Sequence, residues 1–128
     1  MNNEFSIGKM LHASILTANT DISLKFYRDI LGLSVDNSRP DLGFPGAFLN
    51  ITENQQIHIL ELPNPDPVKT RPEHAGRDRH IALSVSNLKI LEERLKKENL
   101  SFSRSKSGRP AIFTRDPDGN GLEFIEEK

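Results

Sequence analysis

The clearest strand signal in the chain is Arg79-His80-Ile81-Ala82-Leu83-Ser84-Val85. Its aliphatic residues fall at every second position, so they share one face of the strand while His80 lies on the other. Ser86-Asn87 follows, and both residue types favour the first position of a helix. Leucines then recur at helical spacing as far as Leu95. The pattern predicts a strand that is followed at once by an amphipathic helix.

The same order of signals occurs earlier in the chain. Residues 9–16 alternate around His12, Asn19-Thr20-Asp21 offers helix caps, and residues 21–31 place apolar side chains at helical spacing. Gly32 then suits the left-handed end of a helix. Because the spacing from His12 to the next strand nearly equals the corresponding spacing from His80, we interpret the chain as a tandem repeat.

Each repeat continues with further strands. In the first half we expect a strand at 33–35, a Pro/Gly loop at 39–46 and a hairpin of strands 47–51 and 56–62; in the second half we expect strands at 100–102, 111–114 and 121–125. The proline-rich, polar segment 63–78 is a linker. We therefore predict a single α+β domain over residues 1–128. In it, two β-α-β-β-β modules, about 8–62 and about 79–126, form an incompletely closed eight-stranded β barrel or cleft.

Composition excludes several function classes. The 128 residues carry 17 Lys plus Arg against 18 Asp plus Glu, a formal net charge of -1 that does not suit phosphate-driven binding of nucleic acid. There is no cysteine, so neither a disulfide nor a thiolate zinc site is possible. No apolar run approaches the ~20 residues of a membrane span, and Met1-Asn2-Asn3-Glu4 lacks the basic start of a signal peptide. We expect a cytoplasmic protein that does not bind membranes.

Three residues with metal-ligating side chains are expected on the sheet faces that no helix covers. His12 and His80 are equivalent by the repeat, and Glu123 alternates with the core-facing Leu122 and Phe124 in the last strand. Two imidazoles and a carboxylate suit Zn²⁺, Ni²⁺, Mn²⁺, Co²⁺ or Fe²⁺. The pattern predicts an open metal site.

Strand 56–62 offers a fourth ligand in either of two residues. His58 and Glu61 lie an odd number of positions apart, so only one of them can face the site. If Leu60 and Leu62 mirror the core-facing residues of the last strand, Glu61 shares the face of His80, and His58 lies toward the core or the rim. We expect Glu61 to be the ligand and keep His58 as the alternative.

Other polar residues carry weaker signals. His74, in the loop 71–78, is expected to be exposed. Arg77, Arg79, Arg109 and Arg115 are either solvated or anchors for an anionic substrate. The segment 116–119 is interpreted as a hairpin turn whose Pro and Gly serve backbone geometry.

Three motifs together resemble the vicinal oxygen chelate superfamily, which includes glyoxalase I, fosfomycin-resistance enzymes, extradiol dioxygenases and bleomycin-resistance proteins. They are Phe26-Tyr27-Arg28-Asp29-Ile30-Leu31-Gly32-Leu33 after His12, the strand at 79–85, and Asp116-Pro117-Asp118-Gly119-Asn120-Gly121-Leu122-Glu123. The resemblance implies a homodimer of paired modules around a divalent metal, with His12, His80 and Glu123 as ligands. It also matches Glu61 to the fourth ligand of glyoxalase I.

The resemblance implies a metal-dependent lyase or isomerase of the glyoxalase type that chelates a small neutral or anionic substrate, with Glu61 or Glu123 as general base. Leu16 and Pro65 replace an arginine and an asparagine that bind glutathione in glyoxalase I, which puts glutathione dependence in doubt. The alternatives are a dioxygenase or fosfomycin-type enzyme that uses three of the ligands, and a metal-free, bleomycin-resistance-like binding protein. The last fits less well, because the chain has one Tyr and no Trp to stack on a planar ligand.

Overall fold

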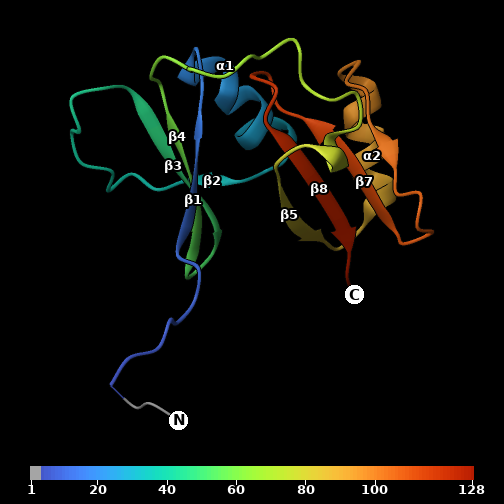
Figure 1. The fold of residues 1–128 in the computed structure, drawn as a ribbon, viewed down its shortest axis with the longest axis horizontal. Coiled ribbons are helices and arrows are strands. Elements are labelled where there is room, and N and C mark those ends of the chain that lie inside the picture. Colours follow the sequence, from blue (N-terminus) through green and yellow to red (C-terminus); the bar gives the residue numbers. More distant parts are fainter. Residues whose placement is uncertain (1–3) are drawn as a thin grey trace.

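The computed structural model describes residues 4–128, and its elements follow the predicted repeat (Figure 1). The first module consists of β1 (His12–Leu16), α1 (Thr20–Leu24), η1 (Lys25–Ile30), β2 (Ser34–Val35), β3 (Gly46–Thr52) and β4 (Gln55–Leu60). The second consists of β5 (His80–Val85), α2 (Leu88–Lys97), β6 (Ser103–Arg104), β7 (Ala111–Arg115) and β8 (Gly121–Glu126). A short helical turn, η2 (Ala75–Arg77), lies in the linker between them.

The two modules form separate four-stranded sheets of the same topology. The strand orders are β1-β4-β3-β2 and β5-β8-β7-β6, and in each sheet the first strand of the module pairs in parallel with its last strand. The remaining pairs are antiparallel. Within residues 4–128 the eight strands do not close into a barrel, so the α+β fold with an open cleft is confirmed.

Helix boundaries follow the predicted caps. The Asn19 side chain accepts a hydrogen bond from the Ile22 N–H at 3.0 Å, and Asn87 does the same for the Ile90 N–H at 3.1 Å. The expected helix at 21–31 divides into α1 and the wider turn η1. It ends before Gly32, whose φ of 84° is the left-handed conformation expected there.

One predicted strand is displaced. The chain at 100–102 does not join the ladder; pairing begins at Ser103, opposite Phe113. The Ser101 carbonyl instead accepts a hydrogen bond from the Thr114 hydroxyl at 2.7 Å. This side-chain contact holds the segment beside β7 without strand geometry.

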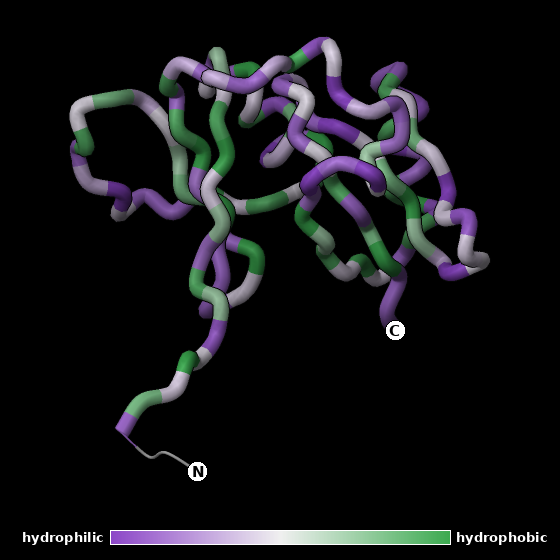
Figure 2. The backbone as a smooth tube through the Cα atoms, in the orientation of Figure 1, coloured by the Kyte–Doolittle hydropathy of each residue, from purple (hydrophilic) through white to green (hydrophobic). Residues whose placement is uncertain are grey.

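A single hydrophobic core joins the modules. It contains Phe26, Tyr27, Leu49, Ile57, Ile59, Leu88, Leu91, Leu95, Ile112, Leu122 and Phe124. Each large apolar side chain buried in this way stabilises the fold by roughly 1.5–3 kcal/mol. Figure 2 shows that the linker after β4 is mostly hydrophilic where it crosses from the first module to the second. No helix of the described residues is long and apolar enough to cross a bilayer.

The turn at 116–119 joins the modules as well as closing a hairpin. The Tyr27 hydroxyl donates to Asp116 Oδ2 at 2.6 Å, and the Thr17 hydroxyl donates to Asp118 Oδ2 at 2.6 Å. Burial raises the pKa of Asp116, while hydrogen bonds from Tyr27 and Asn120 act in the opposite direction. From its sequence this segment is expected to serve backbone geometry alone; the inter-module contact exists only in the folded chain.

Candidate functional site

The second module brings His80 and Glu123 together as predicted. They lie on neighbouring parallel strands, β5 and β8, on the face opposite the core residue Leu122. His80 Nε2 lies 3.2 Å from Glu123 Oε1. The glutamate is buried, with 5% of its surface exposed, whereas the side chain of His80 reaches solvent.

The hydrogen bond on the other ring nitrogen of His80 fixes its tautomer. Nδ1 lies 2.9 Å from the carbonyl oxygen of Asp78, which can only accept, so Nδ1 carries a proton. A neutral His80 therefore turns its Nε2 lone pair toward the carboxylate of Glu123. Such a contact is favourable if His80 is protonated or if a cation lies between the two groups. A histidine that donates one ring N–H to a backbone carbonyl and directs the other nitrogen at a carboxylate fits a metal-ligating pair.

Glu123 has a second charged neighbour, Arg109. Arg109 Nη2 donates to Glu123 Oε2 at 2.8 Å, so the two carboxylate oxygens of Glu123 have different partners. The guanidinium partly neutralises the buried carboxylate and fixes its orientation.

The first module presents His12 together with His58. The ring centroids of the two histidines lie 3.8 Å apart with planes 12° from parallel, and the opposite face of His58 stacks on Phe48 at 3.6 Å. In β4, Ile57 and Ile59 are fully buried in the core, so His58 occupies the open face. The predicted orientation of β4 is therefore wrong.

The error has a clear physical origin. In the repeat, Leu122 and Phe124 of β8 correspond to Ile57 and Ile59 of β4. The prediction instead matches them to Leu60 and Leu62, and Leu62 lies beyond the end of β4. Both faces of β4 carry apolar residues, so alternation alone does not orient the strand. Pairing with β1, which sets Ser14 opposite His58, does so.

A chain of hydrogen bonds fixes the tautomer of His58. The Gln56 amide nitrogen donates to Asp36 Oδ2 and to Asn50 Oδ1, each at 2.9 Å, so the amide oxygen must face His58 Nε2 at 2.8 Å. Nε2 is therefore the protonated nitrogen, and Nδ1 keeps its lone pair. Burial, with a smaller contribution from His12, lowers the pKa of His58.

Glu61 makes a different contact from the one expected of a ligand. It lies just beyond β4, and its Oε1 accepts hydrogen bonds from the backbone N–H of Thr20 at 2.8 Å and from the Thr20 hydroxyl at 3.0 Å. Thr20 is the first residue of α1, so the carboxylate stabilises the start of that helix.

Over residues 4–128, a single chain holds no group of three or more His, Cys, Asp or Glu that could bind a metal. Apart from Glu61, the candidate ligands, including the alternative His58, form two separate pairs. One module carries His12 with His58, and the other carries His80 with Glu123.

Comparisons with known proteins identify the family of the chain. Residues 9–124 match the family model described as the Glyoxalase/Bleomycin resistance protein/Dioxygenase superfamily. The chain belongs to this superfamily. It is 30% identical over 127 residues to the lactoylglutathione lyase of Haemophilus influenzae, covering 94% of this chain and 93% of the relative.

Solved structures show the same glyoxalase-superfamily fold. A protein from Bacillus anthracis assigned to the glyoxalase family superposes with a TM-score of 0.78 at 24% identity, covering 100% of both chains. A variant of the fosfomycin resistance protein FosX from Listeria monocytogenes, with Mn(II) and 1S,2S-dihydroxypropylphosphonic acid, gives a TM-score of 0.74 at 17% identity. It covers 96% of this chain and 95% of that one. Enzymes are thus among the proteins that share the superfamily.

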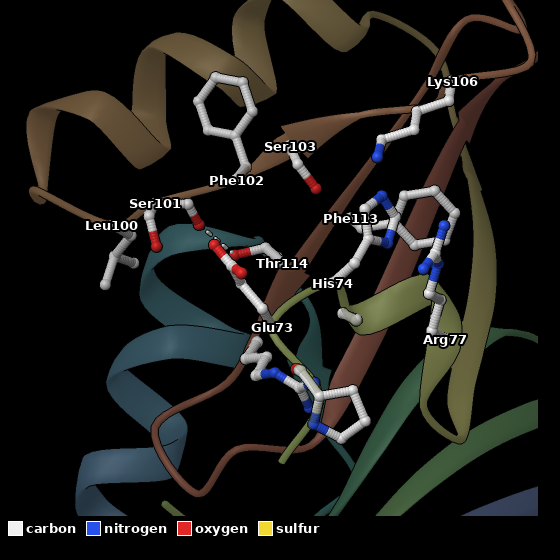
Figure 3. A pocket seen from close by; sticks show the side chains of 13 residues that line it. Glu73, His74, Arg77, Leu100, Ser101, Phe102, Ser103, Lys106, Phe113 and Thr114 are labelled. Carbon is white, nitrogen blue, oxygen red and sulfur yellow. Dashed lines mark hydrogen bonds between the residues drawn. The ribbon is translucent and has the colours of Figure 1, made fainter. Parts of the chain in front are cut away.

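A cavity of about 740 Å³ lies beside the second pair in this glyoxalase-superfamily chain, lined by η2 and by segments before and within β7 (Figure 3). His74 is not exposed as expected: its Nδ1 accepts a hydrogen bond from the Gly76 N–H at 3.0 Å, and its ring packs on Phe113 at 4.8 Å. Phe113 in turn meets the edge of His80 at 5.6 Å. One aromatic ring therefore both lines the cavity and contacts His80 of the His80–Glu123 pair.

The four arginines left open by sequence analysis divide into different roles. Arg115 donates to Asp78 Oδ2 and to the Gly119 carbonyl, each at 2.8 Å, and Arg79 pairs with Asp66. Arg71 also binds Asp78, and the two guanidinium groups hold the pKa of that carboxyl well below its usual range. Within residues 4–128, Arg77 is the one arginine of the four whose side chain has no hydrogen-bond or ion-pair partner; its backbone N–H donates to the His74 carbonyl at 2.9 Å.

Proposed function

We propose that this protein is a divalent-metal-dependent enzyme of the glyoxalase type, a lyase or isomerase that binds a small substrate through adjacent oxygens. The observation that carries the proposal is the pair of His80 and Glu123. His80 Nδ1 is held as a donor, so its Nε2 lone pair and a buried carboxylate oxygen converge at 3.2 Å. This arrangement suits a cation that takes nitrogen and oxygen ligands.

Whether His58 or Glu61 is the fourth ligand, the other three proposed ligands are His12, His80 and Glu123. For that position the geometry favours His58 over Glu61, because His58 shares a face with His12 and keeps a free lone pair on Nδ1. When bound, a divalent ion would act as a Lewis acid that stabilises negative charge on a substrate oxygen.

The chain's own residues supply the remaining chemistry. Glu123 is the proposed general base, because its carboxylate is buried beside His80 while Glu61 is engaged at the start of α1. Arg109 orients Glu123 through the second carboxylate oxygen. The absence of an arginine at Leu16 and of an asparagine at Pro65 argues against glutathione as co-substrate.

A complete ligand set requires a second copy of the chain. Because the two pairs do not meet within one chain, we propose a homodimer in which the His12 face of one protomer lies against the His80 face of its partner. The exposed edge strands β1 and β5 are available for this contact.

Metal binding is the first test. The purified protein is stripped of metal, and Ni²⁺, Zn²⁺, Mn²⁺, Co²⁺ and Fe²⁺ are added back singly while Tm and metal content are measured. We expect about one ion per chain and a Tm increase that is lost in His80→Ala. No response to any ion would contradict the proposal.

Mixing two variants tests the shared site. Neither His12→Ala nor His80→Ala should bind metal alone, but a mixed dimer contains one site in which both faces are intact. Recovered binding after co-refolding supports the homodimer. Failure to recover, with mixed dimers detected by mass, would place all ligands in one chain.

A second candidate function is favoured by one contact. Arg109 already compensates the charge of Glu123, as expected of a metal-free protein that sequesters a ligand. The same titration separates the two, because a sequestering protein would gain stability from its ligand and not from a metal ion.

A further inference from the structure

The cavity beside Phe113 is rich in hydrogen-bond donors at one end. Gly76 N–H donates to His74 Nδ1 at 3.0 Å, so a neutral His74 carries its proton on Nε2. Figure 3 shows Lys106 and Ser103 directed toward the same region, with Arg77 below them. Four hydrogen-bond donors, carried by side chains of different length, therefore surround one space.

Two of these donors carry an uncompensated positive charge. Among the described residues, neither the guanidinium of Arg77 nor the ammonium of Lys106 has an ion-pair or hydrogen-bond partner, although other arginines of the chain are paired. The third cation of the lining, Arg115, is committed to Asp78. The carboxylate of Glu73 points toward Ser101 and Thr114 at the other end of the cavity. The end near His74 is thus electropositive.

Apolar side chains form another part of the cavity wall. Phe102, Leu100 and Phe113 line the cavity together with the charged groups. A ligand that fits has one anionic group and a small hydrophobic body, because each part then meets a complementary surface.

Gly76 is required for this arrangement. A Cβ at this position would lie 2.9 Å from His74 Cε1 and 2.9 Å from Phe113 Cε1, closer than carbon atoms pack. Glycine therefore lets η2 approach β7 closely enough for the His74 ring to lie on Phe113. The donor end is built by the fold of the linker.

We propose that His74, Arg77 and Lys106 form an oxyanion subsite that binds the carboxylate or phosphate group of a small substrate. Phe113 contacts both His74 of this subsite and His80 of the His80–Glu123 pair, so a small ligand whose anionic group is bound at the subsite lies close to the proposed reacting site. Its role as part of an active site rests on the proposed function; its capacity to bind anions does not.

Binding of three small probes tests the subsite directly. Benzoate, phenyl phosphate and neutral benzamide are titrated at constant ionic strength into the purified protein, without added metal, while amide and imidazole resonances are followed by NMR. We expect at least one anion to shift the resonances of Gly76 and His74 saturably. Benzamide should bind with an affinity at least about tenfold lower than that anion. The tighter anion identifies the preferred group as a carboxylate or a phosphate.

Charge-matched variants exclude a general electrostatic effect. The double variant Arg77→Gln/Lys106→Gln should weaken anion binding about tenfold or more. The control Lys89→Gln/Lys97→Gln removes the same charge from the exposed surface of α2 and should leave anion binding unchanged. His74→Phe keeps a ring beside Phe113 without the N–H donor and should weaken binding about two- to tenfold.

Three results would overturn the subsite: equal binding of benzamide, equal loss in both double variants, or no saturable shift with either anion. The outcome is independent of the metal titration. Metal binding without anion binding would contradict the proposed subsite alone. Anion binding without metal binding would support the subsite and contradict the proposed metal-dependent enzyme.

Discussion

His58 Nε2 lies 2.8 Å from Gln56 Oε1, and the opposite end of the same amide is held by Asp36 and Asn50. A reversed amide would set its oxygen against a carboxylate, so the network permits one orientation. The amide therefore determines which nitrogen His58 presents to the open face of β4.

Replacing Gln56 with Met removes this constraint with little change in shape. In the native protein, imidazole ¹⁵N NMR should show Nε2 of His58 protonated and Nδ1 unprotonated; in Gln56→Met the two tautomers should mix. If His58 is a ligand, metal affinity should fall about 10–100-fold. Gln55→Met changes the neighbouring exposed glutamine and is the control. An unchanged tautomer in Gln56→Met would disprove the positioning role.

Two substitutions separate the functions of the glutamates. Glu61→Gln should retain metal binding and cost about 0.3–1 kcal/mol of stability, because it removes a negative charge at the start of α1. Glu123→Gln should lower metal affinity by more than about 100-fold, since even a group that only orients a ligand contributes 10–100-fold. Calorimetric metal titration and urea unfolding measure both effects. Loss of metal binding in Glu61→Gln would restore that residue as the fourth ligand.

Tyr27→Phe should destabilise the contact between the modules by about 1–3 kcal/mol, because the buried carboxylate of Asp116 loses a donor. Burial raises the pKa of Asp116, so its ionisation reduces native stability as pH rises from its ordinary pKa to the raised native one. Without the Tyr27 donor this pKa rises further. Urea unfolding from pH 4 to pH 8 should show a greater loss at the higher pH; an equal loss throughout would refute the argument.

Asp78→Asn should lower stability most at neutral pH. Asp78 accepts hydrogen bonds from Arg71 and Arg115, which lower its pKa, so its contribution is present above the ordinary carboxylate pKa and lost as pH falls through the lowered one. The Tm difference from the native protein should therefore shrink on acidification. Asp66→Asn, which breaks an exposed pair with Arg79, is the matched control and should change Tm little. A pH-independent difference for Asp78→Asn would argue against this cause.

Residues close in sequence determined much of the fold. Three kinds of local feature depend on contacts within a few residues, so the sequence alone predicts them. They are the alternation in residues 79–85, the caps at Asn19 and Asn87, and the left-handed Gly32. Alternation also correctly placed His80 and Glu123 on one face, because Leu122 and Phe124, at alternate positions of β8, are the residues buried in the core.

Only the tertiary structure decided between His58 and Glu61. β4 carries apolar side chains on both faces, so its orientation depends on its pairing with β1, many residues away. The Tyr27–Asp116 contact and the packing of His74 on Phe113 likewise join segments distant in sequence. Local pattern defines which side chains alternate; the partners across the sheet and core define which of them face a site.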